Sequence, residues 1–164
     1  MRRVSQRERA FLDEVFHGAL ATEPIALGTS LGRRSWSPYA ARISLTRDLF
    51  VDGDARADVR LDDPRAASIF AHEAVHVWQR QLGRAVTRQG AVLQAGYTLG
   101  LFDPYAYDTR ERNAASLLAA FVLGNIEQQG RMVEDFVYAA RTGAPTAHFD
   151  KLVVYLRTRR GHTT

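Results

Sequence analysis

The segment from Asp63 to Gly83 constrains the fold most, because it is long, rich in apolar residues and free of helix breakers after Pro64. Asp63 is a favoured N-cap residue, and proline fits the first helical position, where its missing N–H is not needed. Glycine commonly follows the last helical turn. The segment therefore predicts one long helix with an apolar face that must be buried.

Capping signals and helical spacing of apolar residues predict further helices. Ser5 with Glu8, and Asn125 with Gln128, have the spacing of capping boxes. The predicted ranges are 5–18, 113–123, 125–141 and 146–159. These helices leave little of the chain for other elements.

Two remaining stretches are rich in turn residues. Residues 24–51 contain short β-type runs between prolines and glycines, which predict a small sheet. Residues 90–108 combine Gly96, Gly100 and Pro104 with several aromatic residues, so we expect an ordered aromatic loop with at most short helical turns. Without a repeat or linker, 1–164 is expected to form a single α+β domain, mostly helical, with a small N-terminal β-sheet.

Composition excludes several classes of protein. The 164 residues are 46% apolar and 24% charged, which is typical of a globular domain. There is no cysteine, so disulfide scaffolds, thiolate zinc sites and cysteine nucleophiles are excluded, and any metal must be held by His, Asp or Glu. The net charge is +4, but no nucleic-acid motif accompanies the arginines, so nucleic-acid binding is only a third, minor hypothesis.

The chain shows no signal for membranes. The longest uncharged stretches, 89–102 and 113–126, are too short to span a bilayer, and the N-terminus lacks the apolar run of a signal peptide. We therefore expect no membrane partner. The expected location is the cytoplasm, or outside it by a route without a cleaved signal peptide.

The long predicted helix contains His72-Glu73-Ala74-Val75-His76. Positions i and i+4 lie about 40° apart around a helix, so both imidazoles can face one ion. Glu73 lies about 100° from His72, close enough to reach a water at the metal but awkward as a ligand. Zinc hydrolysis requires this division of roles. The alternative is a pair of helix histidines that only form hydrogen bonds inside the fold.

A zinc site needs a third protein ligand. His17 and His148 are possible donors, but Glu127 is better placed, in the first turn of a later helix from which its carboxylate can face the histidines. Glu134 lies on the same face seven residues on, with Asp135 beside it, so either is an alternative ligand or a supporting partner. Glu127 also has a purely structural explanation, as an acidic residue at a helix N-terminus.

These residues resemble known families. The His-Glu-x-x-His helix followed by a glutamate on a later helix resembles the gluzincin type of zincin metallopeptidase. A wider combination of residues resembles small bacterial proteins labelled Vgr-related or Rhs-related, which are associated by name with secretion systems. The matching stretches are 11–16, 33–39, 70–79, 105–107, 125–129, Val133 and 135–136.

The resemblance implies a zincin-like domain in which His72, His76 and Glu127 bind Zn²⁺ and Glu73 is the catalytic base. One departure is Arg131, at a position where many gluzincins have an acidic residue. This departure affects the groups that support the ligands and not the ligands themselves. A tetrahedral oxyanion would need a further donor. The candidates are Tyr97, Tyr105, Tyr107 and His148.

Two functions follow as expectations. The first is a zinc-dependent metallopeptidase that acts on a peptide or protein substrate. The alternative is a secretion-system or toxin-associated module that keeps a structural or vestigial zinc site, docks secretion-system partner proteins and cleaves little. The small size of the chain favours the alternative, because few residues remain to build a long substrate cleft.

Overall fold

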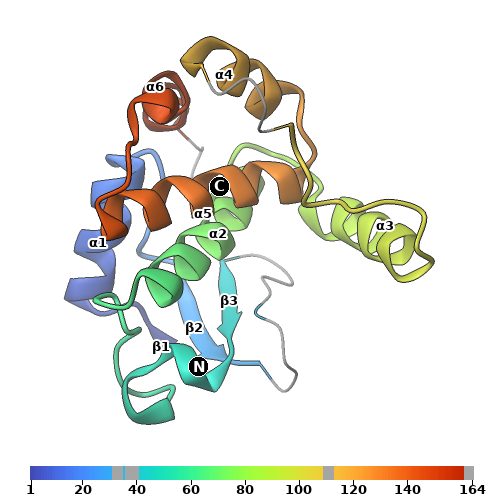
Figure 1. Ribbon diagram of the computed structural model, residues 1–164. Helices are drawn as coiled ribbons and strands as arrows, with labels where there is room; N and C mark the ends of the chain where they lie inside the picture. The colour runs from blue at the N-terminus through green and yellow to red at the C-terminus, as the bar shows by residue number, and fades with distance from the viewer. Residues whose placement is uncertain (31–34, 36–40, 109–112, 161–164) are drawn as a thin grey trace.

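The structure is a computed structural model that describes residues 1–30, 35, 41–108 and 113–160 (Figure 1). Most of the resemblance noted at 33–39 therefore lies outside the described residues. The helices and strands, in chain order, are β1 (Arg2–Arg3), α1 (Gln6–Phe16), β2 (Ala26–Thr29), β3 (Arg42–Leu45), α2 (Pro64–Gln81), α3 (Val86–Thr98), α4 (Ala114–Leu123), α5 (Ile126–Thr142) and α6 (Asp150–Thr158). This mostly helical α+β fold with a small sheet confirms the predicted class.

Helix α2 is the long helix that the sequence predicts, and it runs through the middle of the molecule (Figure 1). The Asp63 side chain accepts a hydrogen bond from the backbone N–H of Arg65, and Pro64 stands at the start of the helix. The helix packs against α5, β3, α1 and α3. Because neighbours cover it on several sides, the rings of Phe70 and Trp78 are fully buried core residues.

Helix α5 lies across α2 and makes the most extensive helix pairing in the described part of the chain. Asn125 caps it, and Gln128 completes the predicted capping box by accepting from the backbone N–H of Asn125. The helix ends at Gly143, whose φ of 74° suits glycine. Both ends of this helix therefore follow from local sequence signals.

The described residues form a three-stranded sheet that lies below α2 in Figure 1, with β3 packed against that helix. Strands β2 and β3 pair in parallel, with Leu27 opposite Ile43, and both side chains are fully buried. Strand β1, which the sequence does not predict, pairs antiparallel with β2. The sheet and α1 complete the core around α2.

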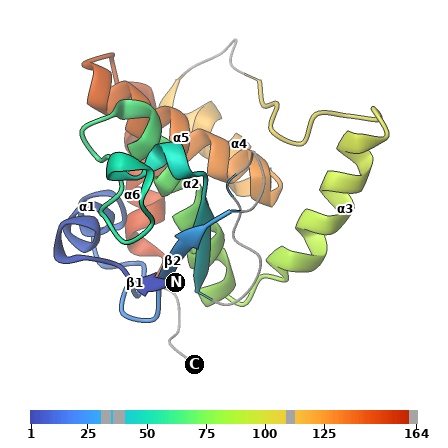
Figure 2. The same ribbon diagram turned by 90° about the horizontal axis from the view of Figure 1, so that it is seen from below.

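The expected loop over 90–108 is partly wrong, because α3 occupies Val86–Thr98. Its glycines misled the prediction. Gly96 is there because a β-carbon at this position would lie 2.4 Å from the ring of Phe102, so the glycine lets the returning chain pack closely. Helix α3 stands out to one side of the molecule in both views (Figures 1 and 2).

Helices α4 and α6 confirm the predicted helical segments near the C-terminus and pack against each other. Among the described residues, none of the helices combines the length and apolar character needed to cross a bilayer.

Candidate metal centre

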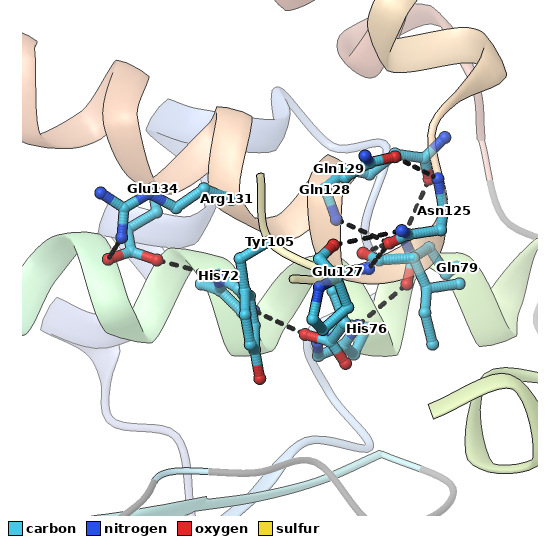
Figure 3. A network of polar contacts seen from close by, with 12 residues as sticks. His72, His76, Gln79, Tyr105, Asn125, Glu127, Gln128, Gln129, Arg131 and Glu134 are labelled. Carbon is cyan, nitrogen blue, oxygen red and sulfur yellow. Dashed lines mark hydrogen bonds and ion pairs between the residues drawn. The ribbon is translucent and has the colours of Figure 1, made fainter. Parts of the chain in front are cut away.

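The two motif histidines lie one turn apart on α2 and face α5 (Figure 3). His72 is 7% exposed and His76 is 5% exposed. Their ring centroids are 5.1 Å apart, with the ring planes inclined by 75°. The helix thus presents two buried imidazoles side by side, as the i, i+4 spacing predicts.

Glu127 approaches both rings from the first turn of α5. Its Oε2 atom lies 3.4 Å from Nε2 of His72 and 3.4 Å from Nε2 of His76. The ligand atoms of these three residues lie within 4.8 Å of one another. The capping of α5 by Asn125 explains the placement, because it fixes where the first turn begins.

The spacing suits a zinc ion. Tetrahedral zinc with bonds of about 2.0–2.2 Å to nitrogen and oxygen holds neighbouring ligand atoms roughly 3.3–3.6 Å apart. The two distances from Glu127 fall in this range, and the separation of the two histidine nitrogens stays within the 4.8 Å that spans the cluster. Two imidazoles and one carboxylate are also ligands that zinc accepts, and three protein ligands leave a fourth position for water.

Glu134 supports the His72 ring from the other side. Its Oε2 lies 2.9 Å from Nδ1 of His72, while its Oε1 lies 3.4 Å from Nη1 of Arg131. Arg131 also reaches Asp135 at 3.1 Å. The acidic partner of the site is therefore Glu134, and Arg131 is paired with that carboxylate. Glu134 and Asp135 both lie outside the three-residue cluster of His72, His76 and Glu127.

Gln79 supports the His76 ring, and the sequence analysis missed it. Its Oε1 lies 3.0 Å from Nδ1 of His76, and the residue has no exposed surface. The signal was available, because Gln79 lies three residues after His76 and its polar side chain interrupts an apolar helix face. Each histidine thus presents Nε2 towards Glu127 and Nδ1 towards a supporting side chain.

Glu73 is buried beside the cluster, with 5% of its surface exposed. Its Oε2 atom has no hydrogen-bond partner among the described residues. Burial raises the pKa of Glu73, although the nearby imidazoles oppose the shift. A buried carboxylate oxygen without a partner is costly in a folded protein, so this atom indicates a group that the residues themselves do not supply.

The ionisable side chains of the cluster shift one another's pKa values. Burial alone lowers the pKa of His72, but hydrogen bonds to Glu127 and Glu134 outweigh burial and raise that pKa to about 10. Burial raises the pKa of Glu127, yet the two imidazoles reverse this and hold it well below its ordinary value. Burial likewise raises the pKa of Glu134, but the hydrogen bond and charge of His72 outweigh burial, so the pKa of Glu134 lies below its ordinary value. Without a cation, a proton on His72 offsets the negative charge of Glu127 and Glu134.

The cluster opens into a cavity of about 360 Å³ between α2 and α3. Glu73, His76 and Glu127 line one side, and Gly90 and Ala91 of α3 line another. The helix missed by the sequence analysis is therefore a wall of this cavity.

Tyr105 is the one oxyanion candidate that lines this cavity among the described residues. Its ring lies 6.3 Å from that of His72. Tyr97 packs edge-on against Tyr105, and the hydroxyl of Tyr107 donates to Asp135 at 2.6 Å.

The two other histidines considered as ligands, His17 and His148, lie away from the cluster. His148 lines a separate cavity with Tyr107 and Asp135. His17 is the left-handed C-cap of α1. The structure therefore brings neither of them into the three-residue group.

Comparison with known proteins places this arrangement in context. No protein-family model matches the sequence. Over 80 residues, or 49% of this chain, the sequence is 40% identical to the type VI secretion system spike protein VgrG2b of Pseudomonas aeruginosa. The solved effector domain of Pseudomonas aeruginosa VgrG2b matches 92% of this chain and 81% of that domain, with a TM-score of 0.66 and 27% identity.

The chain is a homologue of this effector domain. The relation confirms the Vgr-related, secretion-associated part of the resemblance. The matched stretch spans only 7% of the full VgrG2b spike protein, so this chain corresponds to a small part of that protein.

Proposed function

We propose that this chain is a zinc-dependent hydrolase of the metallopeptidase type that acts as a type VI secretion effector. The observation that carries the hydrolytic part is the unpartnered, buried Oε2 of Glu73 beside three side chains with zinc-ligand spacing. A purely structural zinc site needs no such carboxylate beside it. The secretion part is supported by homology to the VgrG2b effector domain.

The residues have distinct roles in this proposal. His72, His76 and Glu127 hold the zinc ion, which when bound polarises a carbonyl and lowers the pKa of water to near 7. Glu73 accepts the proton from the attacking water and passes it to the leaving amine. Its raised pKa brings it closer to the working pH of such a base. Tyr105 is the proposed donor to the oxyanion, because it lines the same cavity.

The second candidate is a secretion-associated module whose zinc site stabilises the fold or serves partner docking. The comparisons support this alternative more directly than hydrolysis, because they concern a spike protein and its effector domain. Both candidates imply export by the type VI apparatus and contact with its proteins. They differ in whether the zinc site, with Glu73 as base, catalyses hydrolysis.

The test combines zinc content with turnover. Purified protein is expected to contain one zinc per chain and to cleave members of a peptide library. Glu73→Gln should keep the zinc and lose about 10²–10⁴-fold of the turnover. Glu14→Gln is the matched control, because the Glu14 side chain is 66% exposed on α1. Full turnover in the Glu73 variant would remove Glu73 as the base.

Stability measurements separate the two candidates. At a free zinc concentration 1,000 times its Kd, binding adds about 4 kcal/mol to the free energy of unfolding. For a domain of this size that corresponds to a rise in Tm of about 8–16 °C, which a chelator should reverse. A large chelator effect with no cleavage by the zinc-loaded wild type favours the structural module.

A further inference from the structure

His76 is connected to a chain of buried amide groups that leads away from the site (Figure 3). Nδ1 of His76 lies 3.0 Å from Oε1 of Gln79. Nε2 of Gln79 donates to the backbone carbonyl of Ile126 at 3.1 Å and to Oε1 of Gln129 at 2.9 Å. Gln79 is fully buried, so these protein groups are its hydrogen-bond environment.

The chain of amides ends at two groups outside the site. Gln129 is 3% exposed, and its Oε1 also accepts from Nη1 of Arg84 at 2.5 Å. Its Nε2 donates to the backbone carbonyl of Phe121 at 2.6 Å. Arg84 lies in the turn between α2 and α3, and Phe121 lies on α4.

The chemistry of these end groups fixes the direction of every hydrogen bond between them. A guanidinium can only donate and a backbone carbonyl can only accept. Gln129 must therefore present its oxygen to Arg84 and its NH₂ to Phe121. Gln79 then meets two acceptors, the oxygen of Gln129 and the carbonyl of Ile126, so its NH₂ must face them. This leaves the oxygen of Gln79 facing His76.

An amide oxygen can only accept, so the proton in its contact with His76 must belong to the histidine. We infer that Gln79 holds a proton on Nδ1 of His76, so that Nε2 offers its lone pair towards Glu127 and the cation. Gln79 is a positioning residue that acts through His76. The position of the proton follows from the contacts alone, while its use for zinc rests on the proposed function.

The two histidines are thus oriented by different groups. His72 is held by the Glu134 carboxylate and His76 by a neutral amide. Beside Glu73 and Glu127, an uncharged acceptor fixes the ring without adding a further buried negative charge. The hydrogen bond made by one ring nitrogen decides which nitrogen binds the metal, so Gln79 selects Nε2.

Long-range ¹H–¹⁵N NMR of the wild-type protein tests the inference, because it distinguishes a protonated ring nitrogen from a bare one. We expect Nδ1 of His76 to be protonated in both the zinc-free and the zinc-loaded protein. A bare Nδ1 in either form overturns the inference. If the wild type binds no zinc, the proposed function fails, and the zinc-free spectrum still decides the position of the proton.

A pair of substitutions extends the test to zinc affinity. Gln79→Leu should weaken zinc binding about 10–100-fold and abolish the preference for a proton on Nδ1 of His76. Gln6→Leu makes the same change at an exposed position of α1 and should leave both properties unchanged. If a folded Gln79→Leu protein binds zinc as tightly as the wild type and keeps the same ring nitrogen protonated, the inference is contradicted. If that variant does not fold, the wild-type spectra remain decisive.

Discussion

Gly130 of α5 faces the ring of His72 so closely that a β-carbon built on the glycine would lie 2.7 Å from Nε2. The same β-carbon would lie 2.9 Å from Cε1 of that ring. Helix α5 can therefore pass this point of α2 only because position 130 carries no side chain. The glycine keeps free the nitrogen that faces Glu127.

Gly130→Ala is expected to weaken zinc binding by at least about tenfold, because the methyl group displaces the His72 ring or covers its Nε2. Alanine favours a helix over glycine by up to about 1 kcal/mol, which opposes the destabilising effect of the clash. Zinc affinity from chelator competition measures the effect. Gly90→Ala is the control at the same cavity, because its β-carbon meets Ile126 at 3.7 Å and Oε1 of Glu127 at 4.0 Å, both ordinary van der Waals contacts. Equal zinc affinities in the two variants would contradict the close contact between position 130 and the His72 ring.

The zinc-free protein should lose stability as pH rises. The pKa of His72 is raised from 6.5 to about 10 by Glu127 and Glu134, which outweigh the opposite effect of burial. A group with a raised folded-state pKa stabilises the fold below its unfolded pKa, and this contribution disappears as pH rises through the folded value. The free energy of unfolding is therefore expected to decline between pH 6.5 and about 10.

Urea denaturation at several pH values in that range measures the decline. His72→Gln serves as the control, because a glutamine cannot titrate, and its profile should be flatter. A wild-type profile as flat as that of the variant would show that His72 is not paired as described.

Glu8 is expected to be a major determinant of stability at the N-terminus. Its buried carboxylate forms two hydrogen bonds with Arg2, at 2.7 and 2.6 Å, and accepts from the backbone N–H groups of Ser5 and Val59. Removal of one partner from a buried ion pair costs about 3–5 kcal/mol. Glu8→Ala should lower the free energy of unfolding by this amount in denaturant titrations.

The exposed pair of Glu14 with Arg141 provides the comparison. Surface ion pairs contribute about 0–1 kcal/mol, so Glu14→Ala should have a small effect. Similar losses in the free energy of unfolding for the two alanine variants would contradict the role of Glu8 in holding β1, α1 and the segment around Val59 together.

The sequence predicts the helices whose signals are local. Asp63 with Pro64 marks the start of α2, and Asn125 with Gln128 marks that of α5, because a cap needs only neighbouring residues. Helix α3 was missed because its glycines are unfavourable in a helix, and its close contact between Gly96 and Phe102 involves the chain that follows the helix. The parallel pairing of β2 with β3 also depends on contacts beyond the strands themselves.

The candidate site likewise combines features that local sequence predicts with features that depend on tertiary packing. The spacing of His72, Glu73 and His76 on one helix is enough to predict that they lie together. The approach of Glu127 depends on how α5 packs on α2, which sequence reasoning could only favour. The contact of Gln79 with His76 could have been predicted from their local spacing, but its contact with Gln129 of α5 depends on the packing of two helices.

Anomalous diffraction at the zinc edge, on crystals of the purified protein, tests the central proposal most directly. The account predicts a single strong peak about 2.0–2.2 Å from Nε2 of His72, Nε2 of His76 and a carboxylate oxygen of Glu127. A solvent molecule should complete the coordination near Glu73. The absence of a peak from zinc-supplemented crystals, or a peak that Glu127 does not contact, would contradict it.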